Sequence, residues 1–152
     1  MLSAHRDAIV DAWFAATANT YPAAVARSLA SGRDRFGNPA GHLLRENLAA
    51  LFDATFLEED DARAEVALAA VVELRAVQQF DAAAAVGFIE PLKEIVRATA
   101  GMEPLADVDP RIERLAHRAS HLYARCRARL AVISAREGTR RNFVANRLRG
   151  RV

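Results

Sequence analysis

Residues 73–97, "ELRAVQQFDAAAAVGFIEPLKEIVR", carry the clearest fold signal in this chain. Apolar residues recur at spacings of three and four on both sides of the centre of the stretch, which indicates helix. Phe80 and Asp81 interrupt the pattern, because Asp81 can cap a following helix and Phe80 can act as its hydrophobic staple. We therefore predict that one helix ends before this break. A second helix is expected over residues 82–100, with a kink at Pro91.

The same periodicity predicts further helices outside this stretch and no strands, since β-branched residues never alternate over a useful length. The helices are expected over residues 3–17, 22–30, 38–57 and 61–77, and from residue 109 to at least residue 137. Residues 66–77 are apolar nearly all round, which favours a position inside the bundle. We predict an all-α fold: a compact bundle of five to six helices, for which a globin-like arrangement is one form, with a long basic C-terminal helix.

Composition sets the broad class of the protein. The chain has 152 residues, which fits one domain. Cys126 is the only cysteine, so an internal disulfide is excluded. No apolar run approaches the roughly 20 residues of a membrane span, and the charged N-terminal stretch does not resemble a signal peptide. We expect a cytoplasmic protein.

Charge is divided unevenly along the chain. Residues 1–110 hold 9 basic and 17 acidic side chains, whereas residues 111–152 hold 12 basic and 2 acidic ones. Such a division arises when the basic end packs along the acidic body, or when it meets an acidic partner. We assign residues 1–137 to a helical domain and residues 138–152 to a basic C-terminal helix extension or tail, with a break at Gly138.

The central stretch resembles the signature of the N-terminal domain of RsbT co-antagonist (RsbRD-type) proteins, found in bacterial stress-signalling complexes. The matching residues are Arg75, Ala76, Val77, Gln78, Phe80, Ala85, Val86, Gly87, Phe88, Lys93, Ile95, Val96 and Arg97. Phe36, Asn38, Pro39 and Gly41 in "FGNPAG" and the segment "YARCRARLAVISAREGTRR" add support. Pro91 departs from the aliphatic residue usual in the family. The resemblance implies an all-α sensing or docking module with no known catalytic chemistry.

The polar residues of the central stretch form the first candidate site: Arg75, Gln78, Gln79, Asp81 and Phe88. A functional interpretation is a polar pocket that reads an anionic metabolite or another signal. A structural interpretation is that Arg75 bonds carbonyl groups or Asp81 and fixes the corner between two helices. We favour the structural interpretation, because apolar bundles often use one satisfied polar cluster to set their packing.

No catalytic, metal or cofactor site is predicted. His117 and His121 have the i, i+4 spacing of metal ligands, but they fall opposite the apolar stripe of their helix, among arginines. His5 and His42 are isolated, and no histidine falls on a clear core face for haem. Cys126 lies on the apolar stripe and is expected to be a buried hydrophobic residue. The sequence contains no phosphate loop and no nucleophile elbow.

The basic C-terminal helix is the second candidate site. Its predicted partner-binding residues are Arg136, Arg140, Arg141, Phe143 and Arg147, with Arg149 and Arg151 beyond them. The apolar spacing favours contact with a protein that has an acidic surface, or self-association into a homodimer. Nucleic acid is disfavoured because Phe143 is the only aromatic residue of the basic tail and no recognition motif is present. A membrane would be reached only through a partner.

These observations predict a non-enzymatic sensor, regulatory or protein-interaction module. One alternative is a small accessory subunit that docks onto a larger, redox-type protein complex. A helical protein that binds haem or another small ligand is the third hypothesis.

Overall fold

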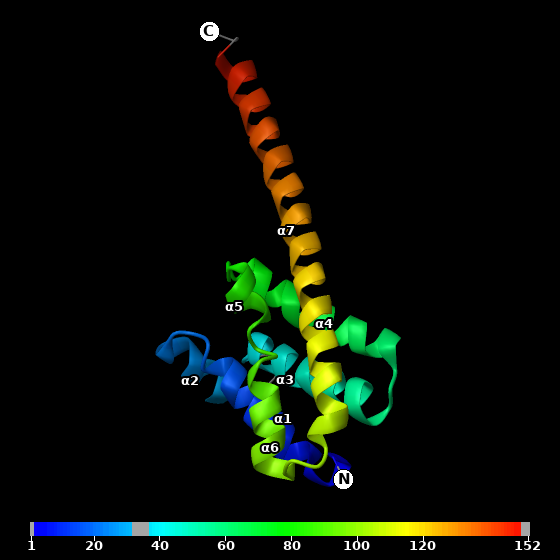
Figure 1. Ribbon diagram of the computed structural model, residues 1–152. Helices are drawn as coiled ribbons and strands as arrows, with labels where there is room; N and C mark the ends of the chain where they lie inside the picture. The colour runs from blue at the N-terminus through cyan, green and yellow to red at the C-terminus, as the bar shows by residue number, and fades with distance from the viewer. Residues whose placement is uncertain (1, 32–36, 150–152) are drawn as a thin grey trace.

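The computed structural model describes residues 2–31 and 37–149, and these residues form helices without strands (Figure 1). The all-α prediction is confirmed. The elements are a 3-10 helix η1 (Leu2–His5), a π-helix η2 (Asp53–Leu57), and the α-helices α1 (Arg6–Ala18), α2 (Ala23–Ser31), α3 (Pro39–Phe52), α4 (Asp61–Val77), α5 (Ala82–Val86), α6 (Pro91–Ala100) and α7 (Leu105–Arg149). Phe36 and Arg151, named above, lie outside the described residues.

The helices pack around one hydrophobic core. α3 packs against α4 and α1, while the first part of α7 lies along α4, α5 and α6. The core side chains with no exposed surface include Ile9, Trp13, Leu44, Leu48, Leu51, Phe52, Val71, Val72, Phe88, Leu92, Val96 and Ala119. Every long helix supplies at least one of these side chains, so burial of apolar surface holds the bundle together.

α7 is the longest element, and Figure 1 shows it leaving the bundle as a straight rod. Its 45 residues correspond to a length of about 68 Å. The helix passes Gly138 without the predicted break, because a helix that lies in water on all sides tolerates the conformational cost of one glycine. The predicted long basic C-terminal helix is thus present.

Three further expectations about the helices are wrong. α4 is not enclosed by the bundle on all sides, because Val66 and Val77 are 72% and 65% exposed. Residues 82–100 form two helices rather than one kinked helix: α5 ends at Val86, and α6 begins with Pro91 at its first position. Proline fits there because the first amide of a helix needs no intrahelical partner.

The third error concerns the start of the last helix. α7 begins at Leu105, not at Asp109, and it contains Pro110. Leu105 and Val108 bury their side chains (7% and 1% exposed) on the stripe that continues to Ile112. This burial offsets the backbone hydrogen bond that Pro110 cannot donate.

Three helices begin directly after a residue whose side chain caps them. The Asn38 side chain accepts from the amide of Gly41, and Pro39 takes the first helical position of α3. Asp60 caps α4 and Asp81 caps α5. Contrary to expectation, the first α-helix does not begin at residue 3, because residues 2–5 form η1 and α1 begins only at Arg6. Among the described residues, no helix combines the length and the apolar content needed to cross a membrane.

Candidate functional site

Arg75 lies in the last turn of α4 and is completely buried (0% exposed). Its Nε donates a hydrogen bond to the carbonyl oxygen of Ala85 (3.0 Å), and its Nη2 donates to that of Ala84 (2.6 Å). These carbonyls belong to the end of α5, which is too short to pair them internally. Nη1 donates to the hydroxyl of Thr20 (3.0 Å), between α1 and α2. One guanidinium therefore joins three segments that are distant in sequence.

Aromatic rings surround the guanidinium of Arg75. Its central carbon lies 4.2 Å from the ring centroid of Phe80, 5.5 Å from that of Tyr21 and 5.6 Å from that of Phe88. A cation over a ring face is attracted by the ring quadrupole, more strongly when both are out of water. Among the described residues, no carboxylate forms an ion pair with Arg75. Rings, carbonyls and one hydroxyl take its place.

Burial shapes the ionisation of this cluster. It lowers the pKa of Arg75, while the neighbouring Tyr21 opposes that shift. It raises the pKa of Tyr21, and here the Arg75 cation opposes the shift. Arginine is protonated far above neutral pH, so the cluster contains a buried cation under physiological conditions.

The other residues of the predicted corner have different positions. Phe88 is buried, and its carbonyl oxygen accepts a hydrogen bond from the indole Nε1 of Trp13 (2.7 Å), with the two rings stacked. Gln78 is exposed, but its Oε1 accepts from the Tyr21 hydroxyl (2.6 Å). Gln79 and Asp81 are also exposed and do not contact Arg75 through any hydrogen bond. The structure thus brings together Arg75 and Phe88, places Gln78 at the edge, and separates the other two.

The sequence analysis missed the partners from the first helix and the turn after it. Trp13, Thr20 and Tyr21 complete the cluster, yet none of them was among the predicted site residues. No local pattern predicts a contact across 55 residues. A useful signal was the arginine itself, because a buried guanidinium in an apolar helix needs acceptors from somewhere.

The corner contacts α7 where that helix still packs on the bundle, a part that we call the root of α7. The hydroxyl of Tyr123, on α7, donates to the carbonyl oxygen of Phe80 (2.8 Å), whose ring covers Arg75. α5 also packs directly on α7. A change in the packing of the corner would therefore act on the place where α7 leaves the bundle.

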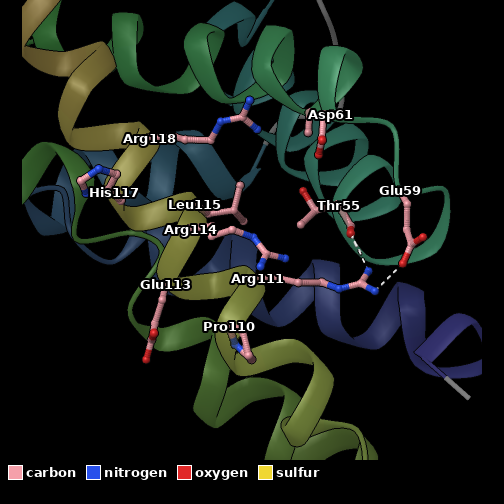
Figure 2. A pocket seen from close by; sticks show the side chains of 11 residues that line it. Thr55, Glu59, Asp61, Pro110, Arg111, Glu113, Arg114, Leu115, His117 and Arg118 are labelled. Atoms are coloured by element: carbon pink, nitrogen blue, oxygen red, sulfur yellow. Dashed lines mark hydrogen bonds and ion pairs between the residues drawn. The ribbon is translucent and has the colours of Figure 1, made fainter.

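A cleft of about 870 Å³ lies elsewhere, between α7, η2 and the start of α4 (Figure 2). Arg111 spans it, donating to the carbonyl oxygen of Thr55 (3.0 Å) and pairing with Glu59. Three arginines and three carboxylates line the cleft: Arg111, Arg114, Arg118, Glu59, Asp61 and Glu113. The lining is balanced in charge, so it does not select an anionic or a cationic ligand.

Charge along α7 divides into two parts. Three arginines near the bundle pair with acidic side chains of the body: Arg111 with Glu59, Arg118 with Glu65 (2.9 Å), and Arg129 with Glu73 (3.2 Å). Beyond Arg129, no arginine in the described part of the chain forms an ion pair. The basic end of the chain therefore pairs with the acidic body only as far as Arg129.

We call residues 131–149 the projecting segment, because these residues are exposed apart from the half-buried Gly138. All five predicted partner-binding residues, Arg136, Arg140, Arg141, Phe143 and Arg147, lie in it and are exposed. Exposed apolar side chains accompany them: Val132 (51%), Ile133 (51%), Phe143 (61%), Val144 (49%) and Leu148 (62%). Exposure of apolar side chains to water is unfavourable, and the fold leaves these side chains exposed.

The cysteine and three of the four histidines take the positions expected from the sequence, whereas His42 is not isolated on the surface. His5, His117 and His121 are exposed, and His42 is half-buried beside Glu46. Cys126 is buried (6% exposed) on the face of α7 that packs on the body. The described residues contain no group of three or more His, Cys, Asp and Glu side chains arranged to hold a metal ion.

Comparison with protein-family models, curated proteins and solved structures finds no match to this chain. The resemblance to the RsbRD-type domain therefore rests on the motif residues named above.

Proposed function

We propose that this protein is a non-enzymatic regulatory module that binds another protein through the projecting segment, in the manner implied by its resemblance to RsbT co-antagonist N-terminal domains. The observation that supports this most is the row of exposed apolar side chains on a helix that has left its own bundle. Burying one such side chain completely is worth about 1.5–3 kcal/mol. Docking on a partner would supply that burial.

The Arg75 corner is the proposed place where a signal acts. It joins α4, α5 and the turn after α1, and Tyr123 connects it to the root of α7. Since no carboxylate of the described residues pairs with this cation, its hold on the corner depends on three acceptors and the covering rings. A signal that loosened any of these contacts would change how the root of α7 is held.

The test is site-specific photo-cross-linking in the native host. A photoreactive phenylalanine analogue replaces Arg136 in the projecting segment and, as a matched control, Val25, which is 42% exposed on α2. We expect a discrete cross-linked protein from position 136 and none from position 25. Equal patterns from both positions, or no product from position 136, would refute the proposed function.

The identity of the cross-linked protein separates two forms of this function. A kinase or an antagonist protein supports the regulatory module. An oxidoreductase subunit supports an accessory subunit that docks by the same segment and senses nothing.

A further inference from the structure

We infer that the partner of the projecting segment is an acidic amphipathic helix, which lies along one defined stripe of α7. This inference rests on the proposed function and specifies its partner. The stripe, called the seam below, consists of Ile133, Glu137, Arg140, Val144 and Leu148.

The seam continues the interface that α7 already makes with its own body. The buried face of α7 carries Leu105, Val108, Ile112, Leu115, Ala119, Leu122 and Cys126, at alternating spacings of three and four. Leu130, half-buried, extends the series, and the seam residues then follow at spacings of three or four. Such spacing keeps a stripe on one side of a helix and is typical of helix–helix packing. The same face that packs on helices within the bundle is thus presented, uncovered, beyond it.

Charge selects the partner. The projecting segment holds five arginines and one glutamate, a net charge of +4. Arg136, Arg141 and Arg147 flank the seam, in the positions where paired helices place their interhelical ion pairs. Two copies of the segment side by side would bring ten arginines together with two glutamates, so like-charge repulsion opposes pairing with a second copy. A helix with acidic flanks meets the same seam with attraction.

The seam also carries polar residues that set alignment. Glu137 and Arg140 occupy its middle, between Ile133 and Val144. A polar side chain in an otherwise apolar seam disfavours registers that leave it unpaired. A partner helix is therefore expected to place an acidic side chain opposite Arg140 and apolar side chains opposite Val144 and Leu148.

A second apolar face provides the control. Val132 and Phe143 lie on another side of the helix, and the Arg147 guanidinium lies 5.7 Å from the Phe143 ring centroid. Val132 and Ile133 are adjacent and equally exposed, at 51% each, but successive helical residues point about 100° apart. An aspartate at either position adds the same charge to the same helix, and only one of them lies on the seam.

The experiment measures binding of two synthetic helical peptides of about 21 residues to the full chain by fluorescence anisotropy. Both carry leucine at the apolar heptad positions, except for one central glutamate that can lie opposite Arg140; one peptide has glutamate at the flanking positions and the other has lysine. We expect the glutamate peptide alone to bind, and to bind more weakly as salt rises from about 0.1 to 0.5 M. Ile133→Asp should weaken its binding by about tenfold or more, whereas Val132→Asp should change it by less than about twofold.

Several results would overturn the inference. One is equal binding of the two peptides, or failure of the glutamate peptide to bind. Another is an equal effect of the two aspartate variants. A third is a dimer in sedimentation equilibrium that Ile133→Asp dissociates, since the seam would then be occupied by a second copy. If position 136 still cross-links a partner while the glutamate peptide fails, the proposed function stands and only the helical, acidic partner is wrong.

Discussion

Arg75 is a buried cation that the fold holds without a carboxylate. Two carbonyl groups of α5 and the hydroxyl of Thr20 accept its hydrogen bonds, and the Phe80 ring covers it at 4.2 Å. The cost of removing a charge from water is offset only when such contacts are complete. Arg75 therefore holds these segments together: its planar guanidinium has five donors in a fixed geometry that reaches separated acceptors, whereas a lysine ammonium places its three donors on one nitrogen.

Arg75→Ala should lower the free energy of unfolding by about 1–3 kcal/mol, because three acceptors lose their donor. Arg75→Lys should lower it by a smaller amount, since the charge remains but the fork is lost. Urea unfolding followed by the fluorescence of Trp13 measures both, because this tryptophan is buried and bonded to Phe88.

Arg125→Ala is the matched control for these variants. Arg125 is exposed on α7, and no ion pair involves it in the part of the chain that the structure describes. Its removal should change the free energy of unfolding by no more than about 0.5 kcal/mol. If Arg75→Ala unfolded at the same urea concentration as this control, the claim that Arg75 stabilises the packing of the segments it bonds would be wrong.

At the residue scale, the sequence predicted that Arg75 bonds carbonyl groups at a corner, and this is confirmed. The alternative acceptor, Asp81, instead caps α5 through the amide of Ala84 (2.8 Å). A capping carboxylate points at its own helix, so it is not available to Arg75. The contributions of Trp13 and Tyr21 depend on how helices cross in space, which local sequence does not encode. The role of the corner in sensing stays a prediction.

At the scale of elements, Asn38 shows how one side chain joins two helices. Its Oδ1 accepts from the amide of Gly41 at the start of α3, while its Nδ2 donates to the carbonyl oxygens of Ser28 and Leu29 near the end of α2. A Cβ atom at Gly41 would lie 2.3 Å from Asn38 Nδ2 and 2.6 Å from the Leu29 carbonyl oxygen. Glycine is required here by the close approach of the two helices.

Two glycine-to-alanine changes should therefore have opposite effects. Gly41→Ala should destabilise the protein by about 1–3 kcal/mol, since the methyl group would collide with backbone and with the cap. Gly138→Ala should increase helix content, because alanine is favoured over glycine by about 1 kcal/mol in a helix and the added Cβ meets no atom within 4 Å. Urea unfolding measures the first effect. The circular dichroism signal at 222 nm, followed on heating, measures the second, because the 45 residues of α7 contribute to that signal. A Gly41→Ala protein as stable as the wild type would show that the Asn38 junction does not restrict the helices.

The sequence predicted the starts of capped helices better than the starts of uncapped ones. Asp81 caps α5 as expected, and Asn38 and Asp60 cap the helices predicted over residues 38–57 and 61–77, because a capping side chain bonds within its own three or four residues. The kink at Pro91 and the start at Asp109 were wrong, because both depend on which apolar residues find a neighbour to bury against. The expectation that Val66 and Val77 are buried was wrong for the same reason: a helix that is apolar all round still faces water where no other helix covers it.

At the scale of the whole molecule, the part of α7 that packs on the bundle has paired arginines, and the part that leaves the bundle has unpaired ones among the described residues. The root of α7 is neutralised by Glu59, Glu65 and Glu73, while the projecting segment retains its arginines. The uneven charge was visible in the sequence, but the position at which pairing ends was not, since it depends on where α7 leaves α4. The division into residues 1–137 and 138–152 remains a prediction, and the described side chains beyond Leu130 are already exposed.

The most direct test of this account is the stability of a chain that ends at Glu137, measured by urea unfolding through Trp13 fluorescence. The account assigns the removed part of α7 to binding, and its described residues bury no side chain in the core. It therefore predicts the same unfolding midpoint as for the full chain, together with loss of binding to the glutamate peptide. A clearly lower midpoint, or a chain that fails to fold, would show that the end of α7 supports the bundle and would contradict the central claim.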